Sequence, residues 1–276
     1  MAVNVVFVKI GFLGSTPLAE ALLDERAVRK DITIRAVSTG CRMEVEDALD
    51  VVEKAIAYKP NIILLISPSI SQPGPKAAIE ALAKTGIPMI VISDTASKKF
   101  IQELKNKELG YIIVDGDSMI GARREFLDPV EMAVFNSDII RILAVTGVFR
   151  LLHIELDKVI ERLKGGQVVE LPRMVVDGEM AIKYAEFSNP YAQVKALACY
   201  RMAEAVGRLS VEGCYVVKER ERYLPIVTAA HELMRKAALL ADEARELEKD
   251  RDTVVRKVHF DDGAIHSKTR LFESLT

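Results

Sequence analysis

The feature of this sequence that most constrains its fold is an alternation of short apolar runs with longer, helix-like segments over the first 115 residues. Runs that are apolar at nearly every position are typical of strands buried on both faces, as in a parallel sheet covered by helices. We therefore expect an α/β fold with a mainly parallel, Rossmann-like sheet and helices on both of its faces. The expected strands are Val5–Ile10, Ile32–Val37, Ile62–Ile66, Pro88–Ile92 and Tyr111–Val114, and the helices between them are Thr16–Arg26, Val45–Tyr58, Pro75–Lys84 and Ala96–Lys107.

Beyond Asp115 the sequence is largely helical. Asp128, Pro129 and Glu131 predict a helix start, because Asp caps the first turn, Pro is favoured at its first position and Glu completes a capping box. The sequence thus predicts an α/β sheet domain of residues 1–127 and a helical part of residues 128–276. The expected elements of the second part are a helix from Asp128 to Lys164 with a break at Gly147, helices at Pro190–Arg208 and Pro225–Asp250, short strands at Val168–Val176 and Cys214–Lys218, and an irregular tail after Thr253.

Composition excludes several classes of protein. Half of the 276 residues are apolar and the net charge is −2, whereas a nucleic-acid-binding protein normally carries a basic excess. The apolar run Ala2–Leu13 is too short to cross a membrane and lacks the basic start of a signal peptide. Three scattered cysteines suit a reducing compartment. We expect a cytoplasmic protein with no nucleic-acid or membrane partner.

Candidate ligand-binding residues follow the predicted strands, because ligands of parallel α/β sheets bind at the carboxyl edge. Two glycines after the first strand would let backbone N–H groups approach an anion, although a tight turn explains them equally well. The stiff loop after the third strand offers hydroxyls and has few conformations to lose on binding. The acid after the fourth strand suits ligand contact or helix capping. The candidates are Gly11, Gly14, Ser15, Ser67, Pro68, Pro73, Gly74 and Asp94.

The segment that joins the two predicted domains carries an arginine pair. Arg123 or Arg124 would suit a bidentate contact to a phosphate or carboxylate of a ligand. The alternative is a structural role, in which the arginines pair with Glu125, Asp128 or Glu131 to anchor the helix start.

No metal site is expected. His231-Glu232 begins like an H-E-x-x-H motif, but the second histidine is missing, so two ligands on one helical face are absent. A histidine–glutamate pair on the helix surface explains His231 as well as a functional role does.

Several stretches resemble a known enzyme family. They include the eleven residues from Met119 to Pro129, and the likeness extends over essentially the whole chain. The family that these stretches resemble is that of the F420-dependent methylenetetrahydromethanopterin dehydrogenases of methanogenic and related archaea. The other stretches are Lys9–Gly11, Ser67-Pro68 with Pro73–Pro75, Glu131–Ala133 with Phe135-Asn136, Leu143–Gly147, Asn189–Ala192 and Ala229–Glu232.

The resemblance implies a reversible hydride transfer from methylenetetrahydromethanopterin to coenzyme F420, a 5-deazaflavin that acts as a dissociable co-substrate. It implies no flavin, nicotinamide or metal, a homohexamer best described as a trimer of dimers, and a place in methane formation from carbon dioxide or its reversal. A carboxylate near the bridge carbon would stabilise the methenyl cation. The candidates for this catalytic role are Glu125, Asp128, Glu131 and, more weakly, His231.

Two other functions remain open on the residues alone. An NADP-dependent oxidoreductase is conceivable, since Ser38, Thr39 and Arg42 follow the second strand, where an NAD enzyme would carry an acid. Against this alternative, the sequence lacks the G-x-G-x-x-G fingerprint of a dinucleotide-binding fold. The second alternative is a non-enzymatic ligand-binding module, in which the segment from Met119 to Pro129 would serve only as a hinge between domains.

Overall fold

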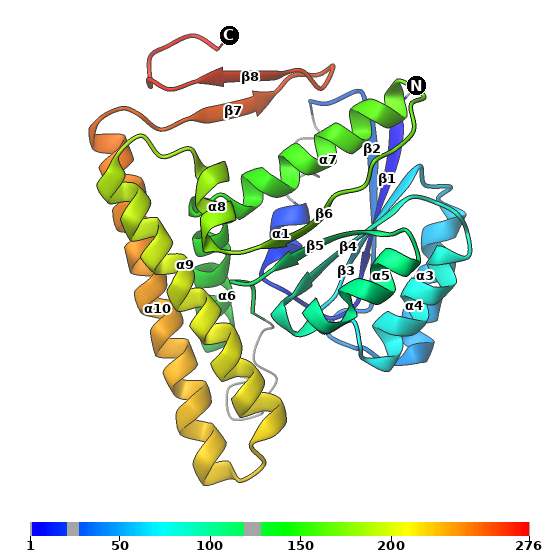
Figure 1. Ribbon diagram of the computed structural model, residues 1–276, viewed down its shortest axis with the longest axis horizontal. Coiled ribbons are helices and arrows are strands. Elements are labelled where there is room, and N and C mark those ends of the chain that lie inside the picture. Colours follow the sequence, from blue (N-terminus) through cyan, green and yellow to red (C-terminus); the bar gives the residue numbers. More distant parts are fainter. Residues whose placement is uncertain (1, 21–27, 119–127, 276) are drawn as a thin grey trace. The chain divides into compact units, whose positions relative to one another are not determined.

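The computed structural model describes residues 2–20, 28–118 and 128–275, which form two compact units (Figure 1). Unit 1 consists of Met1–Val114, Leu152–Val175 and His259–Ala264, and unit 2 of Asp115–Leu151, Val176–Val258 and Ile265–Thr276. Each unit is compact in space and is assembled from three separate stretches of chain. The domain boundary between residues 127 and 128 stays a prediction.

Unit 1 is built on a six-stranded parallel sheet in the order β2-β1-β3-β4-β5-β6. The sixth strand is parallel too, because Tyr111 N donates to Pro172 O at 2.8 Å and, four residues further along both strands, Asp115 N donates to Val176 O at 3.0 Å. The α/β fold with a mainly parallel sheet is therefore confirmed, as are its five N-terminal strands. The strands are β1 (Val3–Lys9), β2 (Ile32–Ser38), β3 (Ile62–Ile66), β4 (Met89–Asp94), β5 (Gly110–Val114) and β6 (Arg173–Val176).

Both faces of this sheet are buried. On one face Val6, Val8 and Leu65 belong to a hydrophobic cluster that also contains the buried apolar residues of α3, α4 and α5. Their neighbours along the strands, such as Phe7 and Leu64, point to the other face and are inaccessible as well. The helical elements of unit 1 are α1 (Ser15–Glu20), α3 (Val45–Ala57), α4 (Pro73–Ala83), the 3₁₀ turn η1 (Thr95–Phe100), α5 (Ile101–Asn106) and most of α7 (Val148–Lys164).

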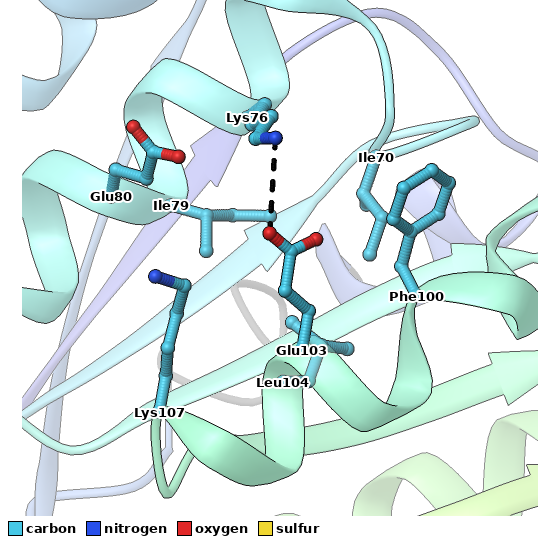
Figure 2. Close-up of a pocket in the computed structure, with 8 residues that line it drawn as sticks. All are labelled: Ile70, Lys76, Ile79, Glu80, Phe100, Glu103, Leu104 and Lys107. Carbon is cyan, nitrogen blue, oxygen red and sulfur yellow. Dashed lines mark ion pairs between the residues drawn. The ribbon is translucent and has the colours of Figure 1, made fainter.

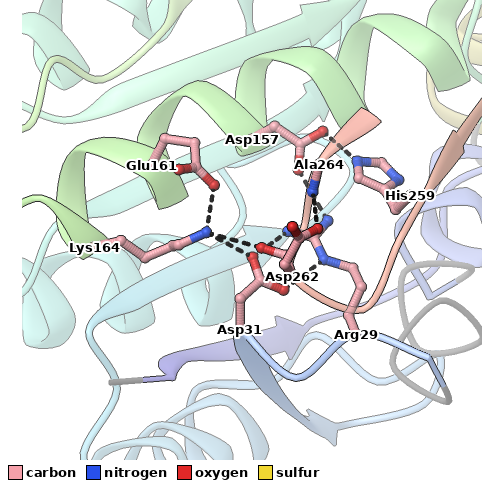
Figure 3. A network of polar contacts seen from close by, with 8 residues as sticks. All are labelled: Arg29, Asp31, Asp157, Glu161, Lys164, His259, Asp262 and Ala264. Carbon is pink, nitrogen blue, oxygen red and sulfur yellow. Dashed lines mark hydrogen bonds and ion pairs between the residues drawn. The ribbon is translucent and has the colours of Figure 1, made fainter. Parts of the chain in front are cut away.

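A buried charge network joins the three stretches of unit 1 (Figure 3). The Arg29 guanidinium, with 1% of its side chain exposed, contacts Asp31 through Nε and Nη2 at 2.9 Å and Asp157 of α7 through Nη1 at 3.0 Å. The second oxygen of Asp157 lies 2.7 Å from Nε2 of His259, and Lys164 Nζ lies 3.1 Å from Asp31. The start of β2, helix α7 and the C-terminal segment are thus held by one set of paired charges.

Unit 2 is mostly helical. Helix α6 (Pro129–Val145) starts and stops as the sequence predicts, with α7 following after Gly147, whose φ is +94°. Helices α9 (Pro190–Val211) and α10 (Arg220–Asp250) pack against each other along their lengths (Figure 1). A short helix, α8 (Gly178–Ala185), is capped by Asp177, which accepts from Met180 N at 2.9 Å. Helix α8 was not predicted from the sequence.

Three local predictions were wrong. Helix α10 begins at Arg220 rather than at Pro225, because a proline removes only one helical donor and the surrounding turns are held by packing, with Tyr223 and Val227 buried. Residues Glu212–Val216 form a π-helical turn, η3, between α9 and α10 instead of a strand. The C-terminal tail is not irregular.

The tail contains a hairpin of β7 (Arg256–His259) and β8 (Ile265–Lys268). Phe260 N donates to Ala264 O at 2.9 Å, and Gly263 N donates to Phe260 O at 3.0 Å across the turn. Gly263 has a φ of +88°, which an Asp-Gly turn accommodates. Over the described ranges, no helix is both long enough and apolar enough to cross a membrane.

Candidate functional site

The loops after β1 and β3 lie at the point where the strand order reverses. Strand β1 pairs with β2 on one side and with β3 on the other, so successive crossovers leave β1 in opposite directions. In doubly wound sheets ligands bind in the crevice outside the carboxyl ends of the strands at such a switch point. The sheet therefore places most of the predicted binding residues at its expected binding edge.

Two glycines allow these loops to pack tightly. Gly11 has a φ of +76°, and a Cβ there would lie 3.0 Å from Pro68 Cδ and from the Met43 sulfur. At Gly74 a Cβ would come within 2.2 Å of the Met43 carbonyl oxygen, which is backbone and cannot turn away. Gly11 and Gly74 thus have a packing reason of their own, because they let the loops after β1, β2 and β3 meet.

The first helical turn after β1 is also buried. Leu13 N donates to Thr16 Oγ1 at 3.1 Å, which closes the turn that leads into α1. Gly14 and Ser15 are buried within it. These two predicted residues therefore lie at the switch point, inside the turn.

The loop after β3 is supported from β4. The Asp94 carboxylate accepts from Ser69 N at 3.2 Å and helps to hold Ser69 at a φ of +43°, which is unusual for a residue with a side chain. The Ser93 hydroxyl donates to Ser67 O at 2.5 Å. Burial raises the pKa of Asp94. Ser67, Pro68 and Asp94 are buried, so in this structure they shape the loop.

The polar groups of that loop that reach solvent are different ones. Ser69, Ser71 and Gln72 are partly exposed, and the hydroxyls of Ser69 and Ser71 lie 3.2 Å apart. Pro73 is exposed at the first turn of α4. The loop is recognisable from its residue types, but these do not determine which of its side chains point outward.

The residues that suited a nucleotide 2′-phosphate are engaged within their own loop. Ser38 Oγ accepts from Gly40 N at 3.0 Å, and Thr39 Oγ1 donates to the Arg42 carbonyl at 2.6 Å. The Arg42 guanidinium lies 2.9 Å from Asp47. These contacts give the loop after β2 a structural explanation that needs no nucleotide.

A shallow groove lies elsewhere on unit 1, between α4 and the η1–α5 segment (Figure 2). Its floor is formed by Ile70, Ile79 and Leu104, and charged side chains stand around it, with Lys76 Nζ 3.8 Å from Glu103. None of its eight lining residues is a predicted site residue, and its charges balance. The groove has no chemistry of its own.

In unit 2 three of the four predicted catalytic residues, Asp128, Glu131 and His231, lie at the start of α6 or against it. Asp128 Oδ1 accepts from Val130 N at 2.7 Å and from Glu131 N at 3.0 Å, so its carboxylate caps the helix. Glu131 Oε1 lies 2.8 Å from Nδ1 of His231 on α10. The His231 side chain is 8% exposed and stacks on Phe135 with 4.3 Å between ring centroids, while 48% of the Glu131 side chain is exposed.

The same two helices are joined again further along. Asp138 of α6 lies 3.2 Å from Nη1 of Arg235 on α10 and 3.9 Å from Arg141. Its carboxylate is buried, and this burial raises its pKa although both arginines act in the opposite direction. The two pairs, Glu131–His231 and Asp138–Arg235, fix the register of α6 against α10 and so the orientation of the exposed Glu131 carboxylate.

The segment with the arginine pair begins from a fixed anchor. The Tyr200 hydroxyl of α9 accepts from Gly116 N at 3.2 Å and donates to Val176 O at 2.8 Å. Burial raises the pKa of Tyr200 well above its ordinary value, so it remains a neutral phenol. Sequence reasoning missed Tyr200, because nothing local marks a contact across 84 positions. Arg123, Arg124 and Glu125 lie outside the described residues.

Among the residues that the structure describes, no three or more His, Cys, Asp or Glu side chains are grouped so as to hold a metal ion. Cys41, Cys199 and Cys214 are all free thiols. Burial raises the pKa of Cys199 to about 12, so this thiol is not nucleophilic near neutral pH.

Comparison with known proteins decides the family. The family model described as methylene-5,6,7,8-tetrahydromethanopterin dehydrogenase matches residues 3–276. The chain belongs to this family. It is 51% identical over 271 residues to the F420-dependent methylenetetrahydromethanopterin dehydrogenase of Archaeoglobus fulgidus, with 98% of each chain covered. It is 47% identical over 274 residues to the enzyme of the same name from Methanocaldococcus jannaschii, with 99% of each covered.

A solved structure matches the whole chain. It is described as an F420 dependent methylene-tetrahydromethanopterin dehydrogenase in complex with methylene-tetrahydromethanopterin and coenzyme F420. The match has a TM-score of 0.95 at 45% identity and covers 100% of both chains. The family predicted from the sequence is therefore confirmed.

Proposed function

We propose that this protein catalyses the reversible transfer of a hydride from methylenetetrahydromethanopterin to coenzyme F420. The observation that carries the proposal is the full-length match, at 45% identity, to a structure with both compounds bound. The reaction takes a hydride from the methylene bridge, leaves the methenyl cation and, with one proton from water, gives reduced F420. F420 binds and leaves in each turnover, as a co-substrate.

This chemistry asks the protein mainly for positioning. The bridge carbon and the acceptor carbon of the deazaflavin must approach to about 3–3.5 Å before transfer. The positive charge that develops is shared by two pterin nitrogens, so neither a metal nor a base that attacks carbon is required. What the protein supplies is orientation and an electrostatic field that favours the cation.

Among the described candidates, Glu131 is the best placed to provide that field. Asp128 uses one carboxylate oxygen to accept two N–H groups at the start of α6, whereas Glu131 is half exposed and held in place by His231. We therefore assign Glu131 the stabilising role and His231 the role of positioning it. Glu125 stays a candidate, and Arg123 and Arg124 stay candidates for the contact to an anionic part of a ligand.

The switch-point residues of unit 1 are proposed to shape the F420 site. Gly11, Gly14, Ser15 and the Ser67–Gly74 loop, supported by Asp94, form a closely packed edge with few conformations to lose on binding. A planar ring system with an anionic tail suits this kind of stiff, hydroxyl-bearing surface.

The test is a direct assay of acceptor use. Purified protein with methylenetetrahydromethanopterin is expected to bleach the deazaflavin absorbance of F420 and to leave NAD and NADP unreduced. Reaction mixtures without the pterin provide the control. Reduction of NADP at a comparable rate would instead favour the nicotinamide enzyme, and binding of F420 without turnover would favour a ligand-binding module.

We propose that this chain forms the homohexamer, a trimer of dimers, that its family resemblance implies. Several large apolar side chains of unit 2 stand exposed, as expected of surfaces that become covered by subunit contacts. Light scattering should give about six times the chain mass, and a monomer at micromolar concentration would contradict this. The exposed apolar residues of unit 2 are Val130, Tyr191, Val194, Val216 and Phe272.

A cytoplasmic location is also part of the proposal, and three cysteines that form no disulfide support it.

A further inference from the structure

Unit 2 contains a polar cavity that the proposed reaction does not use. It opens to solvent, and the space within and in front of it amounts to about 350 Å³. Its walls come from the junction of α6 and α7, the end of α8, the last turns of α10 and the approach to β7. No predicted binding or catalytic residue lines it. The lining residues are Ala144, Val145, Gly147, Arg150, Ala185, Glu186, Phe187, Arg245, Glu248, Val254 and Val255.

Arg150 and Arg245 line this cavity, and Arg256 lies beside it, in contact with the carbonyl of the lining residue Val254. Arg150 donates through Nη1 to Ala185 O and through Nη2 to Val255 O, both at 2.9 Å. Arg256 donates to two backbone carbonyls at 3.0 and 2.5 Å. Arg245 makes no hydrogen bond or ion pair with any residue in the described ranges. Contacts to carbonyl oxygens hold the guanidinium groups of Arg150 and Arg256 in place, and these contacts cancel no positive charge.

The arginines also repel one another. Burial lowers the pKa of Arg150; the charge of Glu186 acts against this shift and the charge of Arg245 acts with it. Burial lowers the pKa of Arg245 as well, with the charge of Arg256 acting in the same direction. The three side chains thus form a row of like charges, with Arg245 in the middle.

Nearby carboxylates neutralise this row only in part. Three acids, Glu186, Glu246 and Glu248, face the three arginines together with Lys249 and Lys257, which leaves two positive charges in excess. Glu186 lies 3.3 Å from Arg150 but 2.5 Å from Lys257. Glu248 accepts from Asn189 N at 2.6 Å with one oxygen and from Thr253 Oγ1 with the other. Glu246, the other acid that acts on Arg245, is paired with Lys249 at 2.5 Å.

We propose that this cavity binds an oxyanion of the phosphate class, with Arg245 as its main ligand and Arg150 and Arg256 as fixed positive charges beside it. A guanidinium presents paired N–H donors that match two phosphate oxygens, and a dianion in this position relieves the repulsion among the three arginines. The centres of water-sized groups can occupy about 40 Å³ of the cavity, where one water needs about 10–15 Å³, so it has room for a few such groups.

The test is titration of the full-length protein with inorganic phosphate at constant ionic strength, made up with chloride and followed by calorimetry and by the melting temperature. The wild type should bind phosphate saturably and melt higher with it, because a ligand that binds only the folded state stabilises that state. Arg245→Gln, which removes no hydrogen bond or ion pair among the described residues, should weaken binding about 10- to 150-fold, as expected for a charge-assisted contact. Arg251→Gln removes the same charge from an exposed arginine at the end of α10, outside the cavity, and should bind like the wild type.

A second arm identifies the source of the anion. If Arg245→Gln also raises the KM of F420 or of the pterin by a similar factor, the site holds the phosphate group of that compound. If both KM values stay unchanged while phosphate binding is lost, the ligand is a free phosphate-class anion. Equal phosphate binding by the wild type and both variants, or an effect that chloride reproduces, would overturn the proposal. Neither result depends on the acceptor specificity of the enzyme.

Discussion

Replacing Arg29 by methionine should destabilise the protein severely, because this arginine is the central cation of the buried network in unit 1. Its side chain is 1% exposed and makes three contacts of 3.0 Å or less with Asp31 and Asp157. Removing one member of a buried ion pair typically costs about 3–5 kcal/mol. Here each carboxylate keeps one partner, Lys164 for Asp31 and His259 for Asp157, so we expect a loss near the lower end, about 3 kcal/mol.

Thermal unfolding gives the measurement and its control. A loss of this size should lower the melting temperature by about 6–12 °C, at roughly 2–4 °C per kcal/mol for a domain of this size. The neighbouring Lys30 pairs with Asp261 at 2.6 Å, but 80% of its side chain is exposed, so Lys30→Met should leave the melting temperature nearly unchanged. Equal shifts for the two variants would refute the claim that burial of the network decides its contribution.

Three further changes test other parts of the structure. Burial raises the pKa of Asp31, but hydrogen bonds from Arg29 and Lys164 outweigh this effect and hold the pKa below its ordinary value. The stabilisation that ionised Asp31 provides is therefore present above the unfolded pKa of about 3.9 and is lost as pH falls through the folded pKa. Asp31→Asn should flatten the acid side of the melting-temperature profile, and an unchanged profile would contradict this. Gly74→Ala forces a Cβ against the Met43 carbonyl oxygen and should cost about 1–3 kcal/mol, seen as a lower melting temperature with a raised KM for F420. Glu131→Gln should slow turnover about 10²–10³-fold with little change in melting temperature, and His231→Gln should slow it less; normal rates in both variants would remove these residues from the mechanism.

The sheet could be predicted because its signal is local. Wholly apolar runs such as Ile62–Ile66 require burial on both faces, and only a parallel sheet with helices on both sides provides that for five runs in succession. The start of α6 could be predicted for a similar reason, since Asp128 and Pro129 determine it within one turn.

The errors arose where tertiary packing outweighs local preference. Pro225 favours a helix start, yet α10 continues through it because the flanking turns are buried. The C-terminal hairpin has strands of only four residues, too short for an alternating pattern to stand out, and its Asp-Gly turn is the only local sign of it.

The candidate site also has features that local sequence predicts and features that only tertiary packing determines. The glycines and the stiff loop at the switch point follow from residue type and strand order. The pairing of Glu131 with His231 spans 100 positions and depends on how α6 packs against α10, which no local pattern encodes. Which of the loop hydroxyls face solvent was equally out of reach, because Ser67 and Ser69 differ only in backbone geometry.

The most direct test of the proposed function is to follow the transferred hydrogen itself. Methylenetetrahydromethanopterin with deuterium at both bridge positions, oxidised in ordinary water, should give reduced F420 with one deuterium in the deazaflavin ring and a methenyl product that retains the other. Transfer should remain complete after exhaustive chelation of metals. Deuterium released to water, or reduced F420 that carries only solvent hydrogen, would contradict direct hydride transfer between the two bound compounds.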